Sequence, residues 1–234
     1  MGKKEELLSQ SLQESRLADM LQDHHKKLLV LKILEYDSMG PPPPFPPPHL
    51  PGETTPSLHH LFKPFQEVLS FFENSLKTSL EKESFQDLVP SLKDCWNTLD
   101  MASILLLMGQ RLTPASLQTQ EALPPSPKRL LQSCMEPYNS QISVVGRAWE
   151  KHIGRRDDGF WGVLQGSSRE KEEHALQIVQ TILEEGTWWN IFIHLSGKAV
   201  FEKRLASGYG ARWTHNGDSF IGFLDPLEIE ENPL

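Results

Sequence analysis

Apolar residues recur at helical spacing through the first part of the chain. Between Lys3 and Tyr36 there is no proline or glycine. Leucine and methionine recur there three, four and seven residues apart, at Leu17, Met20, Leu21, Leu28, Leu31 and Leu34. This spacing places one apolar stripe along a helix. The pattern predicts an amphipathic helix within residues 1–40, of the kind that pairs with another helix in a coiled coil.

A run of prolines interrupts the helical pattern in residues 41–54. Each proline in the segment PPPPFPPP fixes φ and removes a backbone donor, so we expect an extended polyproline II spacer. Proline-rich segments also bind aromatic-lined grooves. The candidate partner-binding residues in this segment are Phe45, Pro46, Pro47 and Pro48.

Two more helical stripes lie within residues 55–110. The first begins after Thr55, which is followed by proline as at a helix start, and runs to Leu80. The second covers about 87–108, with Gly109 as its C-cap. Because few residues separate the stripes, we predict a helical hairpin or small bundle for the amino-terminal half.

Residues 111–137 show no apolar period and are rich in proline, serine, threonine and glutamine. This composition predicts a flexible linker between two domains. Within it, Ser126 precedes a proline and two basic residues. Ser126 is therefore a candidate phosphosite for a proline-directed kinase.

Residues 138–226 predict a separate α+β domain. Ser167 and Glu170 fit a capping box, and the apolar stripe that follows ends at Gly186. Beyond this helix, the turn sequences Ser-Gly and Asn-Gly each separate two strand-like runs. We expect a four-stranded antiparallel meander packed on at least one helix, followed by an acidic tail at 227–234.

Aromatic residues are concentrated in this second domain. Five of the six tryptophans lie there: Trp149, Trp161, Trp188, Trp189 and Trp213. The register of the last hairpin places Trp213 opposite Phe220, an aromatic pair that stabilises a small sheet. The candidate partner-binding residues of this domain are Tyr209, Arg212 and Trp213.

The stretch 144–226 resembles an uncharacterised eukaryotic domain family. It carries the segments GRAWEKHIGRRDDGFWG, TWWNIFIHL, GYGARW and FIGFLDP, of which the last two are the specific pair. The resemblance implies a fold that is complete in itself. It implies no activity, cofactor or catalytic residue.

Few residues of the sequence point to a cofactor or a metal. The nine histidines are isolated or in adjacent pairs, and adjacent helical residues diverge by about 100°, so we expect no metal site and no cofactor. The chain has two cysteines, which exclude a disulfide framework. We expect Cys95 to be a core residue and Cys134 to lie in the flexible approach to the second domain. The longest apolar run, at 101–108, is too short to span a membrane.

These observations favour an intracellular, cytoplasmic or nuclear, non-enzymatic adaptor or complex subunit that binds other proteins through its amphipathic helices. The alternative is a nucleic-acid-associated factor, which would use the basic and aromatic residues of the second domain. The basic residues in question are Arg155, Arg156, Lys198, Lys203, Arg204 and Arg212. Neighbouring acidic residues and a net charge of −8 count against this alternative. An enzyme of unknown type is the third possibility.

Overall fold

The structure is a computed structural model that describes residues 2–43, 45–77, 84–153, 159–163 and 165–227. The expected end at Leu80 of the stripe that begins after Thr55, the basic pair Arg155 and Arg156, and the tail at 228–234 lie outside the described residues. Two compact units make up the chain. The helical unit contains Met1–Pro44, Pro56–Gln110 and Gln118–Gln120, and the α+β unit contains Phe45–Thr55, Arg111–Leu117 and Glu121–Leu234.

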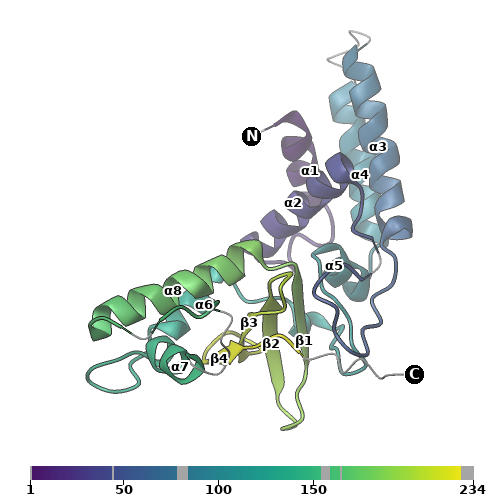
Figure 1. Cartoon of the computed structure of the whole chain (residues 1–234). Helices are drawn as coiled ribbons and strands as arrows, with labels where there is room; N and C mark the ends of the chain where they lie inside the picture. The colour runs from purple at the N-terminus through teal and green to yellow at the C-terminus, as the bar shows by residue number, and fades with distance from the viewer. Residues whose placement is uncertain (1, 44, 78–83, 154–158, 164, 228–234) are drawn as a thin grey trace. The chain divides into compact units, whose positions relative to one another are not determined.

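The described residues of the helical unit form five helices (Figure 1): α1 (Lys3–Gln13), α2 (Asp23–Met39), α3 (His59–Lys77), α4 (Ser84–Thr98) and α5 (Met101–Leu107). The pattern within residues 1–40 thus forms two helices rather than one. The first helix ends after Gln13, and the Ser15 hydroxyl donates to the Leu12 carbonyl oxygen there. The helix α2 then starts with a capping box between Gln22 and His25.

Large apolar side chains fill the core of the helical unit. Trp96 of α4 is fully buried and packs against Phe65 of α3, with ring centroids 4.3 Å apart. Its indole Nε1 donates to the Ser11 hydroxyl of α1 at 2.9 Å. One tryptophan therefore joins three helices, which confirms the predicted small bundle.

In the α+β unit, the part of the chain that the structure describes forms three α-helices and four strands: α6 (Pro127–Cys134), α7 (Val144–His152), α8 (Ser168–Glu185), β1 (Trp188–Ile193), β2 (Ala199–Arg204), β3 (Gly210–Thr214) and β4 (Phe220–Leu224). A short 3-10 helix, η1 (Gln120–Ala122), precedes them. The strands pair antiparallel in the order β1-β2-β3-β4. The helices α6 and α7 contact β4, and α8 contacts β2 and β3 (Figure 1). The predicted four-stranded meander packed on helices is confirmed.

One row of apolar side chains crosses the sheet on the face that the helices cover. The register pairs Ile191 with Phe201, Phe201 with Trp213 and Trp213 with Phe220. Trp213 is fully buried, lies 5.4 Å from Phe220 between ring centroids, and donates from Nε1 to the Leu130 carbonyl oxygen at 3.2 Å. Trp213 is thus the centre of this core.

Residues 111–117, which we expected within a linker, lie along the free edge of β1. Arg111 N donates to Trp189 O, Leu117 N to Ile191 O, and Ile193 N to Ala115 O, at 2.9, 2.9 and 3.0 Å. An edge strand carries unpaired backbone groups, and this segment supplies partners for them. The segment has no apolar period, so its residues gave no sign of this pairing.

The expected polyproline spacer also packs on the α+β unit. Arg111 donates from Nε and Nη2 to the two carboxylate oxygens of Glu53, at 2.6 and 2.7 Å. Arg111 Nη2 also reaches the Pro48 carbonyl oxygen at 3.2 Å, and the Thr187 hydroxyl donates to Pro47 O at 2.8 Å. The side chains of Arg111 and Glu53 are only 5% and 3% exposed. This buried ion pair holds residues 45–54 of the proline-rich segment against the rest of the α+β unit, although its proline content predicted a free spacer.

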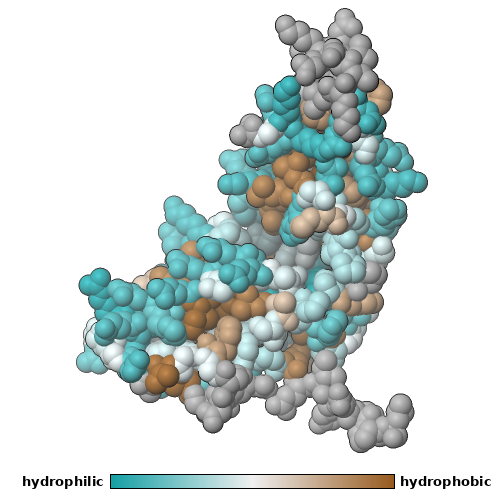
Figure 2. All heavy atoms as spheres, turned by 45° about the horizontal axis from the view of Figure 1, so that its top comes forward, coloured by the Kyte–Doolittle hydropathy of each residue, from teal (hydrophilic) through white to brown (hydrophobic). Residues whose placement is uncertain are grey.

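The surface is mainly hydrophilic on the face that Figure 2 shows, with apolar side chains gathered in separate patches. Among the described residues, none of the helices combines the length and the apolar character that crossing a membrane requires.

We expect Trp213→Ala to lower the free energy of unfolding of the α+β unit by about 3 to 5 kcal/mol, as large aromatic truncations in a core do. Urea denaturation followed by circular dichroism measures this loss. Trp213→Phe is the matched control and should cost less, because it keeps a ring. A loss below about 1 kcal/mol for Trp213→Ala would show that the tryptophan contributes little to the core.

We expect Glu53→Ala to destabilise the α+β unit by about 3 to 5 kcal/mol, because it leaves the buried guanidinium of Arg111 without its carboxylate. The double variant Arg111→Met with Glu53→Leu should cost less than Glu53→Ala, since no uncompensated charge remains. Chemical denaturation of both variants gives the comparison. If the double variant is the less stable one, the two residues do not act as a pair.

Candidate functional site

Polar side chains lie on the sheet face opposite the Trp213 core. Successive strand residues point to opposite faces, so Glu202 and Arg212 alternate with Phe201 and Trp213. Glu202 and Arg212 are direct partners across β2 and β3. His194 directly follows β1, and its N–H donates to the Lys198 carbonyl oxygen at 2.9 Å in the turn to β2. Three strands therefore bring a histidine, a glutamate and an arginine together.

Hydrogen bonds link these three side chains in a chain. Arg212 donates from Nε and Nη2 to Glu202 Oε2, at 2.9 and 2.7 Å. Its Nη1 lies 3.0 Å from His194 Nε2. A guanidinium can only donate, so His194 Nε2 is the acceptor in this contact. Nδ1 accepts from the Ser196 backbone N–H at 3.4 Å and lies 3.3 Å from the Ser196 hydroxyl oxygen.

A second arginine holds the other oxygen of Glu202. Arg204 Nε donates to Glu202 Oε1 at 2.5 Å. Arg204 Nη1 donates to the carbonyl oxygens of Gly208 and Asp225, at 2.6 and 3.0 Å. Glu202 and Arg204 are each 3% exposed, whereas Arg212 is 19% exposed. One carboxylate thus lies between two guanidiniums, which leaves a net positive charge with Arg212 as its exposed end.

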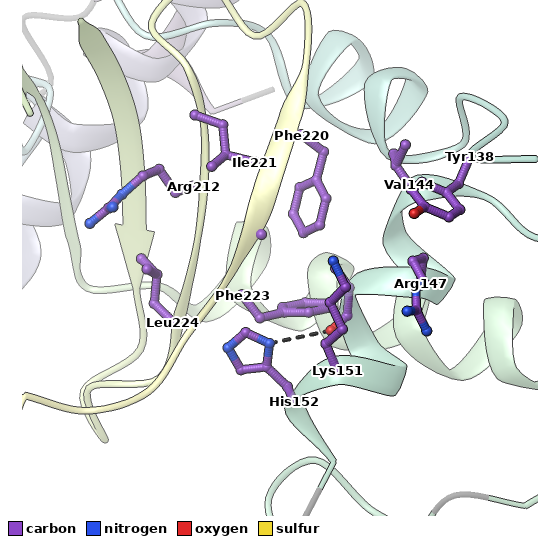
Figure 3. A pocket seen from close by; sticks show the side chains of 12 residues that line it. Tyr138, Val144, Arg147, Lys151, His152, Arg212, Phe220, Ile221, Phe223 and Leu224 are labelled. Carbon is purple, nitrogen blue, oxygen red and sulfur yellow. Dashed lines mark hydrogen bonds between the residues drawn. The ribbon is translucent and has the colours of Figure 1, made fainter. Parts of the chain in front are cut away.

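Two cavities meet at Arg212 and Ile221, which line both of them. The first, called here the histidine cavity, has a volume of about 580 Å³ and is lined also by His194, Lys198 and His215. The second, the α7 groove, has a volume of about 400 Å³ and lies between α7 and β4 (Figure 3). A bulge in β4 explains why Ile221 faces both cavities, because the register of β3 and β4 shifts between Arg212 and Trp213.

The two specific motifs of the sequence surround this network. The glycines of GYGARW let the strand approach closely: a Cβ at Gly210 would collide with the Lys203 carbonyl oxygen and lie 2.6 Å from Arg204 Cγ. Gly208, with φ of +91°, places the carbonyl that Arg204 binds. In FIGFLDP, Gly222 lies opposite Arg212, and Asp225 accepts from Trp161 Nε1 at 2.9 Å. Both motifs therefore support the arginine pair.

Among the candidate partner-binding residues of this unit, only Arg212 lies in the cavities. Tyr209 is 6% exposed and stacks on Phe160 with ring centroids 3.8 Å apart, and Trp213 is core. Burial leaves neither ring available to a partner.

The other sequence candidates lie away from the network. Pro47 and Pro48 use their carbonyls within the unit, as described above, while Phe45 is 44% exposed. Pro46 is half-buried beside them. Ser126 is the N-cap of α6, where its hydroxyl accepts from Arg129 N at 3.3 Å.

Sequence reasoning missed Glu202 and treated His194 as isolated. A signal was present, because the turn at Gly197 fixes the β1–β2 register and the alternation of β2 places Glu202 on the face opposite Phe201. Across β2 and β3, this register also places Arg212 beside Glu202. Among the described residues, no three histidine, cysteine, aspartate or glutamate side chains are placed to hold a metal ion.

The network defines a class of site. An imidazole can take a proton, and a fixed guanidinium beside it can stabilise negative charge that develops on an anion. These residue types are the ones that acid–base chemistry on an anion uses.

Two comparisons with known proteins match part of the chain. Residues 131–225 match the sequence model of the CdiA C-terminal tRNase toxin domain. A solved structure, the toxic C-terminal tip of CdiA from Pseudomonas aeruginosa in complex with an immune protein, is 30% identical over 40% of this chain and 99% of that one, with a TM-score of 0.36. No curated protein sequence matches the chain.

These findings correct several predictions. The non-enzymatic adaptor is wrong, because the matching family is one of nuclease toxins. The preference for a non-enzyme over an enzyme, and the description of the chain as an adaptor and phosphoprotein, are wrong for the same reason. The expected cytoplasmic or nuclear location is overturned by similarity to a bacterial toxin domain.

The two cysteines are placed differently from the expectation. Cys134 is fully buried in α6, whereas Cys95 is half-buried in α4. Burial raises the pKa of the Cys134 thiol from 9.0 to about 12. Burial also raises the pKa of Cys95 to about 11, and Asp94 adds to this effect. Neither thiol is poised to act as a nucleophile near neutral pH.

We expect both thiols to react slowly with iodoacetamide at pH 8. Because the thiolate is the reactive form, a pKa of about 11 in place of 9.0 lowers the rate at Cys95 about a hundredfold, and Cys134 should be slower still. Raising the pH toward 10 should speed the reaction at Cys95. Mass spectrometry of timed samples measures both sites, with the chain unfolded in guanidinium as the control. Faster labelling of Cys134 than of Cys95 in the folded chain would contradict the described burial.

Proposed function

We propose that the α+β unit cleaves RNA, at the site formed by His194, Glu202 and Arg212. The observation that carries the proposal is the hydrogen-bonded chain of these three side chains at the edge of an open cavity. The match of residues 131–225 to a tRNase toxin domain supports transfer RNA as the substrate class.

The reaction uses the RNA's own 2′-hydroxyl as the nucleophile. His194 Nε2 takes the hydroxyl proton, the 2′ oxygen bonds to the adjacent phosphorus, and the bond from phosphorus to the 5′ oxygen breaks. The products are a 2′,3′-cyclic phosphate and a 5′-hydroxyl end. His215 lines the same cavity. We assign to it the role of general acid, which donates a proton to the departing 5′ oxygen.

Arg212 stabilises the negative charge of the phosphate, and Glu202 holds the Arg212 guanidinium in position. A bound phosphate oxygen draws Arg212 Nη1 away from His194 Nε2, which frees the Nε2 lone pair to take the hydroxyl proton. Glu202 Oε2 keeps the other side of the guanidinium in place through two bonds. Arg204 fixes Glu202 in turn, so the positive group is oriented before the substrate binds.

The resemblance of residues 144–226 to an uncharacterised eukaryotic domain family covers nearly the same region as the tRNase match. We propose that its two motifs exist to hold this site, since GYGARW contains Arg212 and the glycines that support Arg204. Members of that family that keep the arginine, together with counterparts of His194 and Glu202, would share the reaction.

We also propose that other proteins bind the helical unit. The apolar residues that α2 leaves at the surface, Leu31 at 46% and Met39 at 75% exposed, are the contacts that a partner helix would meet. This contact is separate from the cleavage site.

We expect His194→Ala to lower kcat/KM for cleavage of transfer RNA by about 10² to 10⁴, because it removes the base. Arg212→Lys should lower it by about 10² to 10³, since lysine cannot keep two bonds to Glu202 and reach a phosphate. Denaturing gels measure cleavage, and chromatography identifies the cyclic phosphate.

The matched control is His60→Ala, which removes an exposed histidine of α3 and should cleave at the parental rate. A substrate with 2′-deoxyribose at the cleaved nucleotide should resist the enzyme. Parental activity in His194→Ala, or cleavage of the deoxy substrate, would contradict the proposed mechanism.

A further inference from the structure

The α7 groove is lined by positively charged side chains, although the chain as a whole is acidic. Arg147 and Lys151 of α7 line it together with Arg212 of β3 (Figure 3), and no aspartate or glutamate is among its lining residues within the described part of the chain. The whole chain carries a net charge of −8. A groove that collects cations on an acidic protein is suited to an anion.

Lys151 is the cation in this groove that no acidic residue neutralises. It is exposed, and within the described residues it makes neither a hydrogen bond nor an ion pair. It lies four residues after Arg147, so both point from one face of α7. The nearest carboxylate on α7, that of Glu150, is shared between Arg147 at 3.3 Å and Lys171 at 3.1 Å.

An exposed aromatic ring completes the lining. Tyr138 is 54% exposed, and the guanidinium carbon of Arg147 lies 5.9 Å from its ring centroid. Exposed aromatics beside cations form the platforms on which proteins stack the bases of single-stranded nucleic acid. Because Arg212 and Ile221 line both cavities, a strand that leaves the histidine cavity reaches this platform over Arg212.

We propose that the α7 groove binds the single-stranded RNA next to the cleaved bond, with Lys151 on a second phosphate and Tyr138 stacked on an unpaired base. The inference rests on the proposed function for the identity of the ligand as RNA. It adds that the substrate must be unpaired at this position, which makes a loop or an end the region that is cut.

The test measures binding without cleavage. The full chain with His194→Ala is titrated onto a fluorescently labelled 12-nucleotide uridine RNA at several salt concentrations. Removing one phosphate contact with Lys151→Gln should weaken binding and reduce the slope of log K against log salt by about 0.7. Lys151→Arg should keep the slope, because it keeps the charge.

Lys128→Gln is the matched control, since Lys128 is exposed on α6 and does not line the groove. It should leave the slope at the parental value. An equal change in the Lys128→Gln and Lys151→Gln variants, or no binding of the 12-nucleotide RNA by the parent, overturns the proposal.

Tyr138→Ala tests the stacked base. It should weaken binding of the uridine RNA about tenfold, as the loss of one stacked base does, and leave an abasic strand of equal length unaffected. Two results would overturn the stacking. One is an equal loss of affinity for the uridine RNA and the abasic strand, and the other is that the parental chain binds a duplex of the same length as tightly as the single strand.

The two proposals fail in different ways. One outcome is that the chain with His194 intact cuts no RNA while the Lys151 and Tyr138 variants still weaken RNA binding as expected. In that case the proposed cleavage is wrong, and the proposed RNA binding in the α7 groove is supported. If cleavage occurs and the Lys151 slope is unchanged, only the groove is wrong.

Discussion

The register of the antiparallel meander is the constraint on which both the core and the site depend. Side chains alternate between the two faces of a sheet, so the register that brings Phe201 to Trp213 in the core also brings Glu202 to Arg212 on the opposite face. A slip of one residue would exchange the faces and place charged groups in the core. The burial of Trp213 therefore stabilises the geometry of the arginine–glutamate pair.

The polar face is stabilised by charges that depend on one another. Glu202 is buried, and a buried carboxylate is costly unless it is paired and fully hydrogen-bonded. Arg204 and Arg212 each take one of its oxygens, so its charge is compensated on both sides. The excess positive charge is left at Arg212, the more exposed of the two arginines. The same arrangement that compensates the charge of Glu202 leaves a cation beside His194.

Segments that precede the expected domain at 138–226 also belong to the α+β unit. The segment 111–117 covers the free edge of β1, Glu53 binds Arg111, and Leu130 of α6 accepts from Trp213. The unit is thus assembled from parts of the chain that proline content suggested were spacers. A backbone carbonyl or an edge N–H offers no sequence signal, because every residue except proline has the same groups.

The sequence by itself determined the elements with strong local signals. The helical stripes, the capping box at Ser167, the hairpin turns and the pairing of Trp213 with Phe220 follow from periodicity of 3.6 or 2 and from turn chemistry, which act over a few residues. The sequence also pointed to Arg212, although for a different role. Only the tertiary structure placed His194, Glu202 and Arg212 within hydrogen-bonding distance, and paired Glu53 with Arg111. These contacts join residues on different strands or segments far apart in sequence, and their energy depends on burial, which a local pattern does not encode.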